Sequence, residues 1–394
     1  MSGNAMRINP GGRLEVTDIL GRDDDIRRYW NILSRQGLIL SAERRIGKTH
    51  IALKMCAECE PAFLPFYQDL EGIHSIKELL RAIYRTVDGS LSKSDRWKSR
   101  LAKWSTLLPE RIGNLDLTAV RDNWPSLLST AFDDLIDVTG DQTVLMIWDE
   151  FPLMLYNLCE REGERVAIEL LDQLRALRQK HGNRLRFILT GSIGLHLVLR
   201  SLQRVGNAND PVNDLYAGTV PPMGPAQTRR LAEELLGEIE TNPVEKREIA
   251  ALLADEIGGF PYYIHHVVDQ LQQLRKPVVK SDAMSAIDAL IYDPQDRANF
   301  RYYLTRIDTY YESGEKVVAL AILDVVAAQN TPQSIEQVVN LVRHRSIAAS
   351  DEDVRTTLGL LVEDHYLFKA RHNEKMSYDF RWKLVKRWWR ETRT

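Results

Sequence analysis

An apolar run followed at once by a loop containing glycine and lysine is the feature that most constrains this fold. Leu38 to Leu40 precede the stretch SAERRIGKTH, residues 41–50, and a helical pattern follows it. From Ala42 to Thr49 the stretch fits GxxxxGK[ST], a phosphate-binding loop between a strand and a helix, except that alanine stands at the first glycine position. That position is less constrained than the glycine beside the lysine, because it needs only a conformation that a small residue adopts. The sequence therefore predicts a phosphate loop, and a chance match in a basic turn is the alternative.

The residue types in this loop indicate its ligand. Backbone N–H groups near Gly47 and at the start of the next helix would surround a β-phosphate, Lys48 would neutralise the β- and γ-oxygens, and Thr49 would hold Mg²⁺. ATP and Mg²⁺ are thus the expected cofactors, with Lys48 also acting in catalysis. The expected nucleotide-binding residues of the loop are Ala42, Arg45, Ile46, Gly47, Lys48, Thr49 and His50.

Two acids follow a second apolar run, VLMIW, and favour hydrolysis over binding alone. Asp149 would hold Mg²⁺ through water, and Glu150 would orient and polarise the attacking water. The next such run, FILTGS, ends with Thr190 and Ser192, which are candidate sensors of the γ-phosphate; strand-end caps are the alternative. Arg200 and Arg204 on the following helix are candidates for an arginine supplied to a neighbouring subunit, and a solvated helix face is the alternative.

The first half of the chain alternates strand-like runs with helical patterns, which is typical of a parallel α/β sheet. Strands are expected at 38–41, 63–70, 143–150 and 185–192, with helices between them. Residues 88–125 are polar and rich in Trp, Lys and Arg, and no strand core is visible there. We interpret them as an insertion.

The second half is helical, after a Pro-rich connector at 220–225. A helix is expected to end at the glycines of GGFP, residues 258–261, and another to start near the proline. From about residue 296 the pattern predicts three helices, a hairpin turning at His372-Asn373-Glu374, and a last helix. That order is a winged helix.

Composition excludes several classes of protein. A formal net charge of −3 and a pI near 6.3 argue against a generally basic protein that coats nucleic acid. Cys56 and Cys59 form a CxxC in a predicted helix, but no second pair completes a zinc site, so no metal is assigned there. No run of 18 apolar residues and no charged, then apolar leader is present, which predicts no membrane insertion and a cytoplasmic protein.

Four segments together resemble the P-loop ATPases of the AAA+/STAND superclass, and most closely the archaeal-type ATPase clade. They are ILGRDDDI at 19–26, AERRIGKT at 42–49, LMIWDE at 145–150 and FILTGS at 187–192. NDLYAG at 213–218 and GGFP at 258–261 are similar to further segments of that family. The resemblance implies an ATPase core at 1–225 with the insertion 88–125, a helical lid at 226–295 and a winged helix at 296–394.

The resemblance also implies residue roles and a mode of action. Gly21 and Arg22 would lie near the base and ribose, and Pro261 would lie against the nucleotide from the lid. Ala217-Gly218 stands where the family has Gly-Arg, so no arginine role is carried over there. Proteins of this kind act as slow ATP-driven switches, which implies a homo-oligomer on ATP binding and a protein partner.

Nucleic acid is the competing partner. The expected recognition helix begins with three acids, SDED, and would repel phosphates. Residues 365–394, by contrast, hold nine Lys or Arg against three Asp or Glu, with Trp382, Trp388 and Trp389 among them. This segment, or the insertion 88–125, could contact nucleic acid; docking of the tryptophans on the ATPase core or on a protein partner is favoured. The functional hypotheses are thus an ATP-driven switch, a DNA-handling ATPase of loader or transposition-regulator type, and a nucleotide-binding scaffold without turnover.

Overall fold

The structure is a computed structural model that describes residues 6–91, 117–192, 194–204, 210–345, 347–372 and 375–394, with side chains from residue 123 onward in the second range. The described residues form two compact units. The first, here called the sheet unit, consists of Arg22–Ala42 and Lys48–Val220. The second, here called the C-terminal unit, consists of Met1–Gly21, Glu43–Gly47 and Pro221–Thr394.

The sheet unit is built on a parallel sheet in the order β2-β3-β4-β1-β5. Its strands are β1 (Leu38–Ser41), β2 (Phe63–Asp69), β3 (Thr143–Asp149), β4 (Leu185–Gly191) and β5 (Tyr216–Thr219). The first four confirm the predicted strands, and β3 and β4 are almost wholly buried, as unbroken apolar runs in a parallel sheet require. The sequence did not predict β5, because its four residues, YAGT, contain no apolar run.

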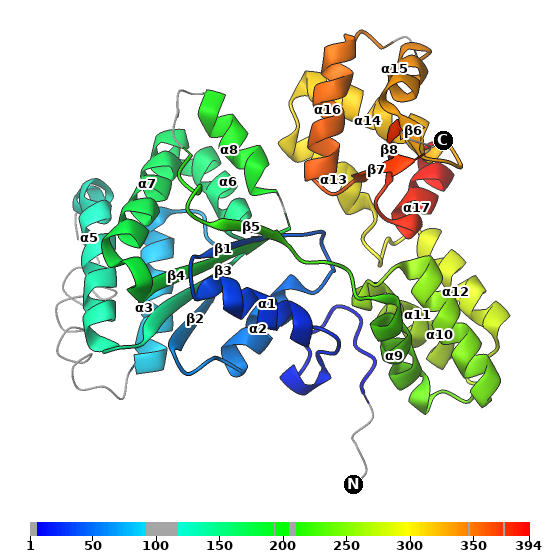
Figure 1. Cartoon of the computed structure of the whole chain (residues 1–394), viewed down its shortest axis with the longest axis horizontal. Coiled ribbons are helices and arrows are strands. Elements are labelled where there is room, and N and C mark those ends of the chain that lie inside the picture. The colour runs from blue at the N-terminus through cyan, green and yellow to red at the C-terminus, as the bar shows by residue number, and fades with distance from the viewer. Residues whose placement is uncertain (1–5, 92–116, 193, 205–209, 346, 373–374) are drawn as a thin grey trace. The chain divides into compact units, whose positions relative to one another are not determined.

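Helices pack around this sheet in Figure 1. They are α1 (Asp23–Leu33), α2 (Lys48–Ala57), α3 (Ile76–Leu91), α5 (Leu117–Val138), α6 (Phe151–Glu162), α7 (Glu164–His181) and α8 (Leu195–Arg204), with a short 3-10 turn at Gly182–Arg184. Another 3-10 turn, Val16–Asp18, belongs to the C-terminal unit. The predicted insertion at 88–125 overlaps the ends of α3 and α5, and its residues 92–116 lie outside the described part of the chain. No helix among the described residues is long and apolar enough to cross a membrane.

The lid segment of the C-terminal unit is helical, as predicted. It contains α9 (Pro225–Leu235), a 3-10 turn at Leu236–Glu238, α10 (Pro243–Ile257), α11 (Pro261–Gln273) and α12 (Lys280–Ile291). Asn242 caps α10 by accepting hydrogen bonds from Val244 N and Glu245 N. Between α10 and α11, Gly259 has a φ of 87°, and a Cβ there would lie 2.3 Å from Met223 O, so only glycine fits at this break.

The remaining segment has the order of a winged helix. It contains α13 (Arg301–Tyr310), α14 (Ser313–Ala327), β6 (Gln333–Ser334), α15 (Ile335–Arg343), α16 (Asp351–Glu363), β7 (Leu367–His372), β8 (Lys375–Phe380) and α17 (Lys383–Arg393). The strands pair antiparallel in the order β6-β8-β7. Residues 373–374 of the predicted hairpin turn lie outside the described residues. The predicted fold class, a parallel P-loop NTPase sheet followed by a helical lid and a winged helix, is confirmed.

The last helix, α17, packs against α10, α12 and α14 within the C-terminal unit. Trp389 is fully buried and donates from Nε1 to Asp324, the ring of Trp388 stacks 5.7 Å from Phe300, and Trp382 meets Phe260 edge-on at 4.6 Å. The sequence favoured docking of the tryptophans on the ATPase core or on a protein partner. Within the C-terminal unit they contact residues of the lid and winged-helix segments instead, namely Phe260, Phe300 and Asp324.

Candidate nucleotide site

The loop between β1 and α2 has the backbone that its sequence requires. Gly47 has a φ of 101° and Arg45 a φ of 69°, whereas Ala42 is not left-handed. An alanine at position 42 therefore carries no backbone strain, and its carbonyl accepts a hydrogen bond from Lys48 Nζ at 2.8 Å. The departure from the glycine pattern leaves the local conformation of the loop intact.

Asp149, at the end of β3, accepts hydrogen bonds from hydroxyl groups of neighbouring elements. Its Oδ2 accepts from Thr49 Oγ1 at 2.6 Å and from Tyr67 OH at 3.3 Å, and its Oδ1 accepts from Thr190 Oγ1. Asp149 is 2% exposed. A carboxylate beside the hydroxyl of the GKT threonine is an oxygen donor set of the kind that Mg²⁺ takes, so Thr49 and Asp149 fit the metal predicted from the sequence.

Tyr67 is a site residue that the sequence analysis missed. It lies on β2 two residues before Asp69, which is in register with Asp149, so its side chain shares the Asp149 face of the sheet. Side chains along 63–70 alternate between the two faces of the sheet, so the pairing of β2 with β3 is enough to place Tyr67 on the face of Asp149. Its hydroxyl donates to the carboxylate of Asp149, which would hold Mg²⁺, and so restrains the orientation of that carboxylate.

Removal of the Tyr67 hydroxyl should weaken the binding of Mg²⁺ at the site. In Tyr67→Phe, Asp149 loses one donor but keeps Thr49 and Thr190, and we expect the Mg²⁺ concentration for half-maximal ATP turnover to rise about tenfold. A titration of turnover with Mg²⁺ measures this, with Tyr292→Phe as the control because Tyr292 is 56% exposed on the C-terminal unit. An unchanged Mg²⁺ requirement would show that Tyr67 only fills space.

Glu150 turns sharply out of β3. Its φ of 55° and ψ of 33° are left-handed, and it forms the N-cap of α6, with Pro152 in the first turn. Its Oε2 accepts hydrogen bonds from Ser192 N and Ser192 Oγ, both at 3.1 Å. Burial raises the pKa of Glu150; Lys48 opposes this rise and the charge of Asp149 adds to it. A left-handed non-glycine residue at the end of the strand aims this carboxylate at the end of β4.

The raised pKa gives an expected pH dependence. A general base must be deprotonated, so turnover should fall as the pH drops through the pKa of Glu150, at a pH above the ordinary glutamate range. Because the pKa of Glu150 is raised in the folded protein, the protonated side chain adds to the free energy of unfolding at low pH. That contribution is lost as the pH rises through the pKa of Glu150 in the folded state. A pH profile of kcat for the wild type should therefore show an acid limb above pH 4.5, the unperturbed value for glutamate. A profile that is flat down to that pH would exclude Glu150 as the base.

The other predicted residues are spread over both units. Arg22 is 3% exposed and donates from Nη1 to Asp25 at 3.2 Å, and burial lowers its pKa. Gly21 has a φ of 69°, and a Cβ there would come within 3.1 Å of Gln227. Pro261 is the first residue of α11. His50 lies in the first turn of α2, and Arg200 and Arg204 lie on α8, the former partly buried and the latter exposed.

The structure brings together one group of the predicted residues within the sheet unit. These residues are linked by hydrogen bonds or by the electrostatic effect of Lys48 on Glu150, and they are Lys48, Thr49, Asp149, Glu150, Thr190 and Ser192. Asp149, Glu150, Thr190 and Ser192 lie at the ends of the neighbouring strands β3 and β4, and Lys48 and Thr49 begin α2 after the loop that follows β1. This is the edge where open parallel sheets bind ligands.

The CxxC is not part of this site. Cys56 lies on α2 and Cys59 just after it, and burial raises the pKa of Cys56 to about 12 and that of Cys59 to about 11. Thiols with such pKa values are protonated at neutral pH and react poorly. Among the described residues, no group of three or more His, Cys, Asp or Glu side chains could hold a metal ion.

Comparison with known proteins places the fold. No family model and no curated protein matches the sequence. Among solved structures, a Walker-type ATPase of Pyrococcus abyssi matches with a TM-score of 0.66 at 15% identity, covering 97% of this chain and 99% of that one. The ORC2 protein of Aeropyrum pernix, in its ADPNP-ADP complexes, matches with a TM-score of 0.56 at 13% identity, covering 94% and 93%. The chain has the fold of an archaeal-type P-loop ATPase. The resemblance inferred from the P-loop ATPase motifs is confirmed at the level of the fold.

Proposed function

We propose that this chain binds ATP with Mg²⁺ and hydrolyses it slowly, as a switch that couples nucleotide state to oligomerisation or to binding of a protein partner. The observation that carries the proposal is the hydrogen bonding of Asp149 to Thr49, with Glu150 next in the chain. In the hydrolysis step, Lys48 would neutralise charge on the phosphate oxygens while Glu150 accepts a proton from the attacking water. Mg²⁺, when bound, would neutralise charge on the β- and γ-phosphate oxygens.

The position of Glu150 supports slow turnover. Both hydrogen bonds from Ser192 fall on one carboxylate oxygen and lower the pKa of Glu150, although burial raises that pKa more. This oxygen would have to release both bonds before it could accept a proton from water, which fits slow turnover. Arg200 and Arg204 on α8 would then be the candidates to complete the site of a neighbouring copy, in a homo-oligomer formed on ATP binding.

The Aeropyrum pernix ORC2 structure is of ADPNP-ADP complexes, which supports nucleotide binding by a chain of this fold. Nucleotide would occupy the loop 42–50 in the present chain, with Gly21, Arg22 and Pro261 as candidates for contacts beyond the phosphates. These roles are inferred from the family resemblance.

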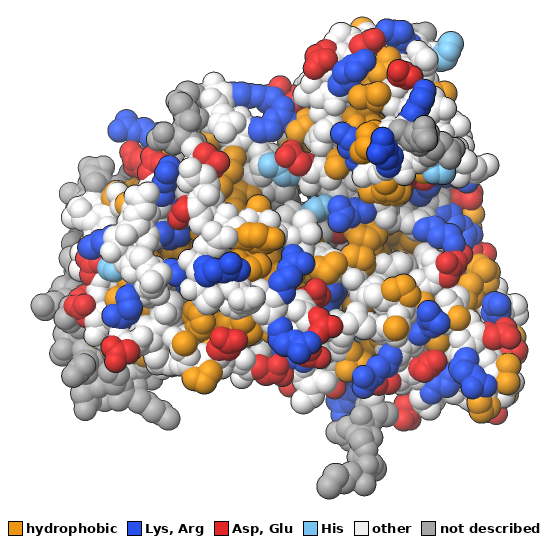
Figure 2. Space-filling model, in the orientation of Figure 1, with side chains coloured by type: hydrophobic (Ala, Val, Ile, Leu, Met, Phe, Trp, Pro, Cys, Tyr) orange, Lys and Arg blue, Asp and Glu red, His pale blue; other side chains and the backbone are white. Residues whose placement is uncertain are grey.

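A DNA-handling ATPase is the alternative, and the charges of the C-terminal unit weigh against it. The cations of α17 are engaged within that unit: Lys383 with Asp255 and Glu256, Lys386 with Asp379, Arg387 with Asp288, and Arg393 with Asp324. The first turn of α16 carries Asp351, Glu352 and Asp353. On the face drawn in Figure 2, basic and acidic side chains are interspersed. Lys369, Arg371 and Lys375 of the wing are exposed, and Lys375 lies 3.8 Å from Glu336. With the insertion 88–125, they are the candidates for a nucleic-acid contact.

The test is ATP turnover together with mass by light scattering, with ATP, ADP or no nucleotide, and with or without double-stranded DNA. The switch predicts measurable turnover and a larger mass with ATP than with ADP, both lost in Lys48→Ala. Turnover stimulated by DNA in a salt-sensitive manner would favour the alternative. Absence of ATP binding by the wild type would refute both, and ATP binding without turnover would leave a nucleotide-binding scaffold.

A further inference from the structure

Part of the phosphate loop is packed into the C-terminal unit. Residues Glu43–Gly47 belong to that unit, whereas Ala42 and Lys48 on either side belong to the sheet unit. Consecutive side chains of this segment are held there. The guanidinium of Arg44 lies 4.4 Å from the centre of the Tyr302 ring, and that of Arg45 lies 4.3 Å from the centre of the Tyr262 ring. Cations over aromatic rings at these distances attract.

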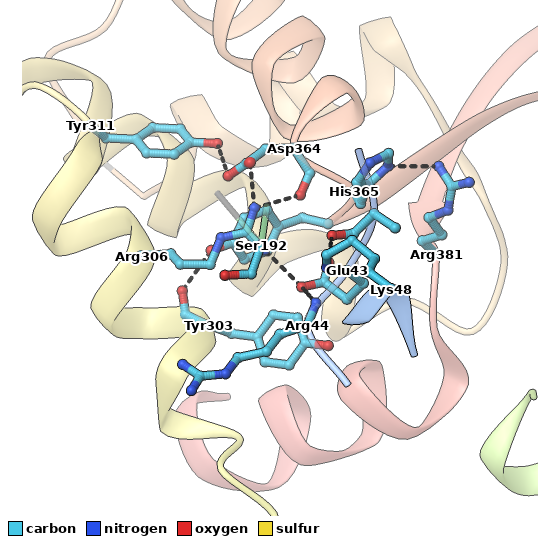
Figure 3. Close-up of polar contacts among 12 residues, drawn as sticks. Glu43, Arg44, Lys48, Ser192, Tyr303, Arg306, Tyr311, Asp364, His365 and Arg381 are labelled. Atoms are coloured by element: carbon cyan, nitrogen blue, oxygen red, sulfur yellow. Dashed lines mark hydrogen bonds and ion pairs between the residues drawn. The ribbon is translucent and has the colours of Figure 1, made fainter. Parts of the chain in front are cut away.

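The carboxylate of Glu43 makes a further contact, an ion pair with Arg306. Its Oε1 accepts a hydrogen bond from Arg306 Nη1 at 2.7 Å and another from the backbone N of Arg44 at 3.1 Å (Figure 3). Arg306 lies on α13, one helical turn after Tyr302. The carboxylate therefore ties the backbone of the loop to a helix that is more than 250 residues away in sequence.

Asp364 holds the other side of the same guanidinium. Arg306 Nη2 donates to Asp364 Oδ1, and also to Asp364 O at 3.0 Å, and Tyr311 OH donates to Asp364 Oδ2 at 3.3 Å (Figure 3). Asp364 follows α16 directly and precedes β7, so it is fixed by the winged-helix segment. Burial lowers the pKa of Arg306, but the charges of Asp364 and Glu43 raise it more, which leaves it well above its ordinary value.

This cluster is almost inaccessible to water. Arg306 is 1% exposed, Glu43 1% and Asp364 0%. A buried charge is tolerated only while it stays paired, so movement of Glu43 away from Arg306 would leave a carboxylate in a dry environment. Arg45, two residues on, holds a left-handed φ of 69°, a conformation that persists when the surroundings impose it. The cluster therefore holds Glu43 of the loop against α13 and against Asp364, the residue that follows α16.

We propose that Arg306, oriented by Asp364, is a positioning residue that acts through Glu43 to preorganise the phosphate loop for nucleotide, an inference that rests on the proposed function of that loop. Phosphate binding needs several backbone N–H groups to converge, and a loop already held in shape loses less conformational entropy when the ligand arrives. The winged-helix segment thereby contributes to nucleotide affinity through residues that need not touch the nucleotide. A purely structural role of the cluster in the C-terminal unit is the competing explanation.

The test is a double-mutant cycle on Glu43→Gln and Arg306→Lys in the full chain. Glu43→Gln leaves the Arg306–Asp364 pair intact, so the fold should persist, and Arg306→Lys keeps the charge but loses the planar fork that serves both carboxylates. Dissociation constants for a fluorescent ATP analogue and for ADP are measured by titration, well below the unfolding temperature, with circular dichroism as the check on folding. Each single variant should bind about tenfold more weakly, and the double variant about as weakly as one single variant, because both changes remove the same contact.

Arg301→Lys is the matched control, since Arg301 lies on the same helix and is exposed. It should bind nucleotide as the wild type does. Wild-type affinity in Glu43→Gln, or losses that multiply in the double variant, would overturn the positioning role while leaving the proposed function in place. A lower melting temperature with unchanged affinity would assign the cluster to stability alone, and a wild type that binds no nucleotide would overturn the proposed function as well.

Discussion

Replacement of Glu150 by glutamine is expected to lower ATP turnover about 10²–10⁴-fold while ATP stays bound. The amide keeps the size of the side chain and can still accept a hydrogen bond from Ser192 through its oxygen, but it cannot take a proton from water. Asp149, with its contacts to Thr49 and Thr190, is untouched by the change. Single-turnover hydrolysis measures the loss, and light scattering should find the variant trapped in the larger, ATP-bound assembly.

Glu160→Gln is the matched control for this prediction. Glu160 is an exposed residue of α6, the helix that Glu150 caps, and the same substitution there removes a charge far from Asp149. Its turnover should equal that of the wild type. A Glu150→Gln protein with wild-type turnover would mean that another group activates the water, and a variant that also loses ATP binding would mean that Glu150 supports the loop rather than the chemistry.

Replacement of Trp389 by alanine is expected to lower the free energy of unfolding of the C-terminal unit by about 3–5 kcal/mol. The Trp389 side chain is fully buried, its ring lies 5.9 Å from those of Phe380 and Trp388, and its Nε1 donates to Asp324 at 2.8 Å. The substitution leaves a large cavity and removes a donor from a nearly buried carboxylate that Arg345 and Arg393 also serve. Urea unfolding followed by far-ultraviolet circular dichroism measures the change.

Two companion variants separate the causes of that loss. Trp389→Phe keeps most of the apolar contact but loses the N–H group, so it should cost about 1–2 kcal/mol, the penalty for one buried hydrogen bond. Glu391→Ala changes an exposed residue of the same helix and should stay within about 0.5 kcal/mol of the wild type. Equal costs for Trp389→Ala and Glu391→Ala would contradict the packing described for α17.

Most of the sheet could be predicted because local pattern and tertiary burial agree there. The strands β1, β3 and β4 contain the unbroken apolar segments LIL, VLMIW and FIL, and such a segment has few alternatives to a buried parallel strand. The strand β5 is different: YAGT contains a glycine and no apolar stretch, and it becomes a strand only because β1 offers an open edge to pair with. Tertiary pairing, which local sequence does not encode, decided that element.

The arrangement of the candidate site shows the same division. The sequence singled out Lys48, Thr49, Asp149 and Glu150, because each occupies a fixed place in a motif whose chemistry needs that side chain, and the structure brings these four residues together. Tyr67 could not, since its role depends on which strand lies beside β3. Glu43 is less predictable still: the motif leaves its position unrestricted, and its partner Arg306 lies in a segment whose pattern gives only a helix.

The assignment of residues 43–47 to the C-terminal unit limits how this chain can be divided. A fragment ending near residue 220 would carry the loop but none of Tyr262, Tyr302 and Arg306, and a fragment starting at 221 would carry those side chains without the loop. Neither piece would contain both partners of the Glu43–Arg306 ion pair. If the C-terminal half were exchanged with that of a related protein, by gene fusion or during evolution, residue 43 would have to suit the residue at position 306 of the new half.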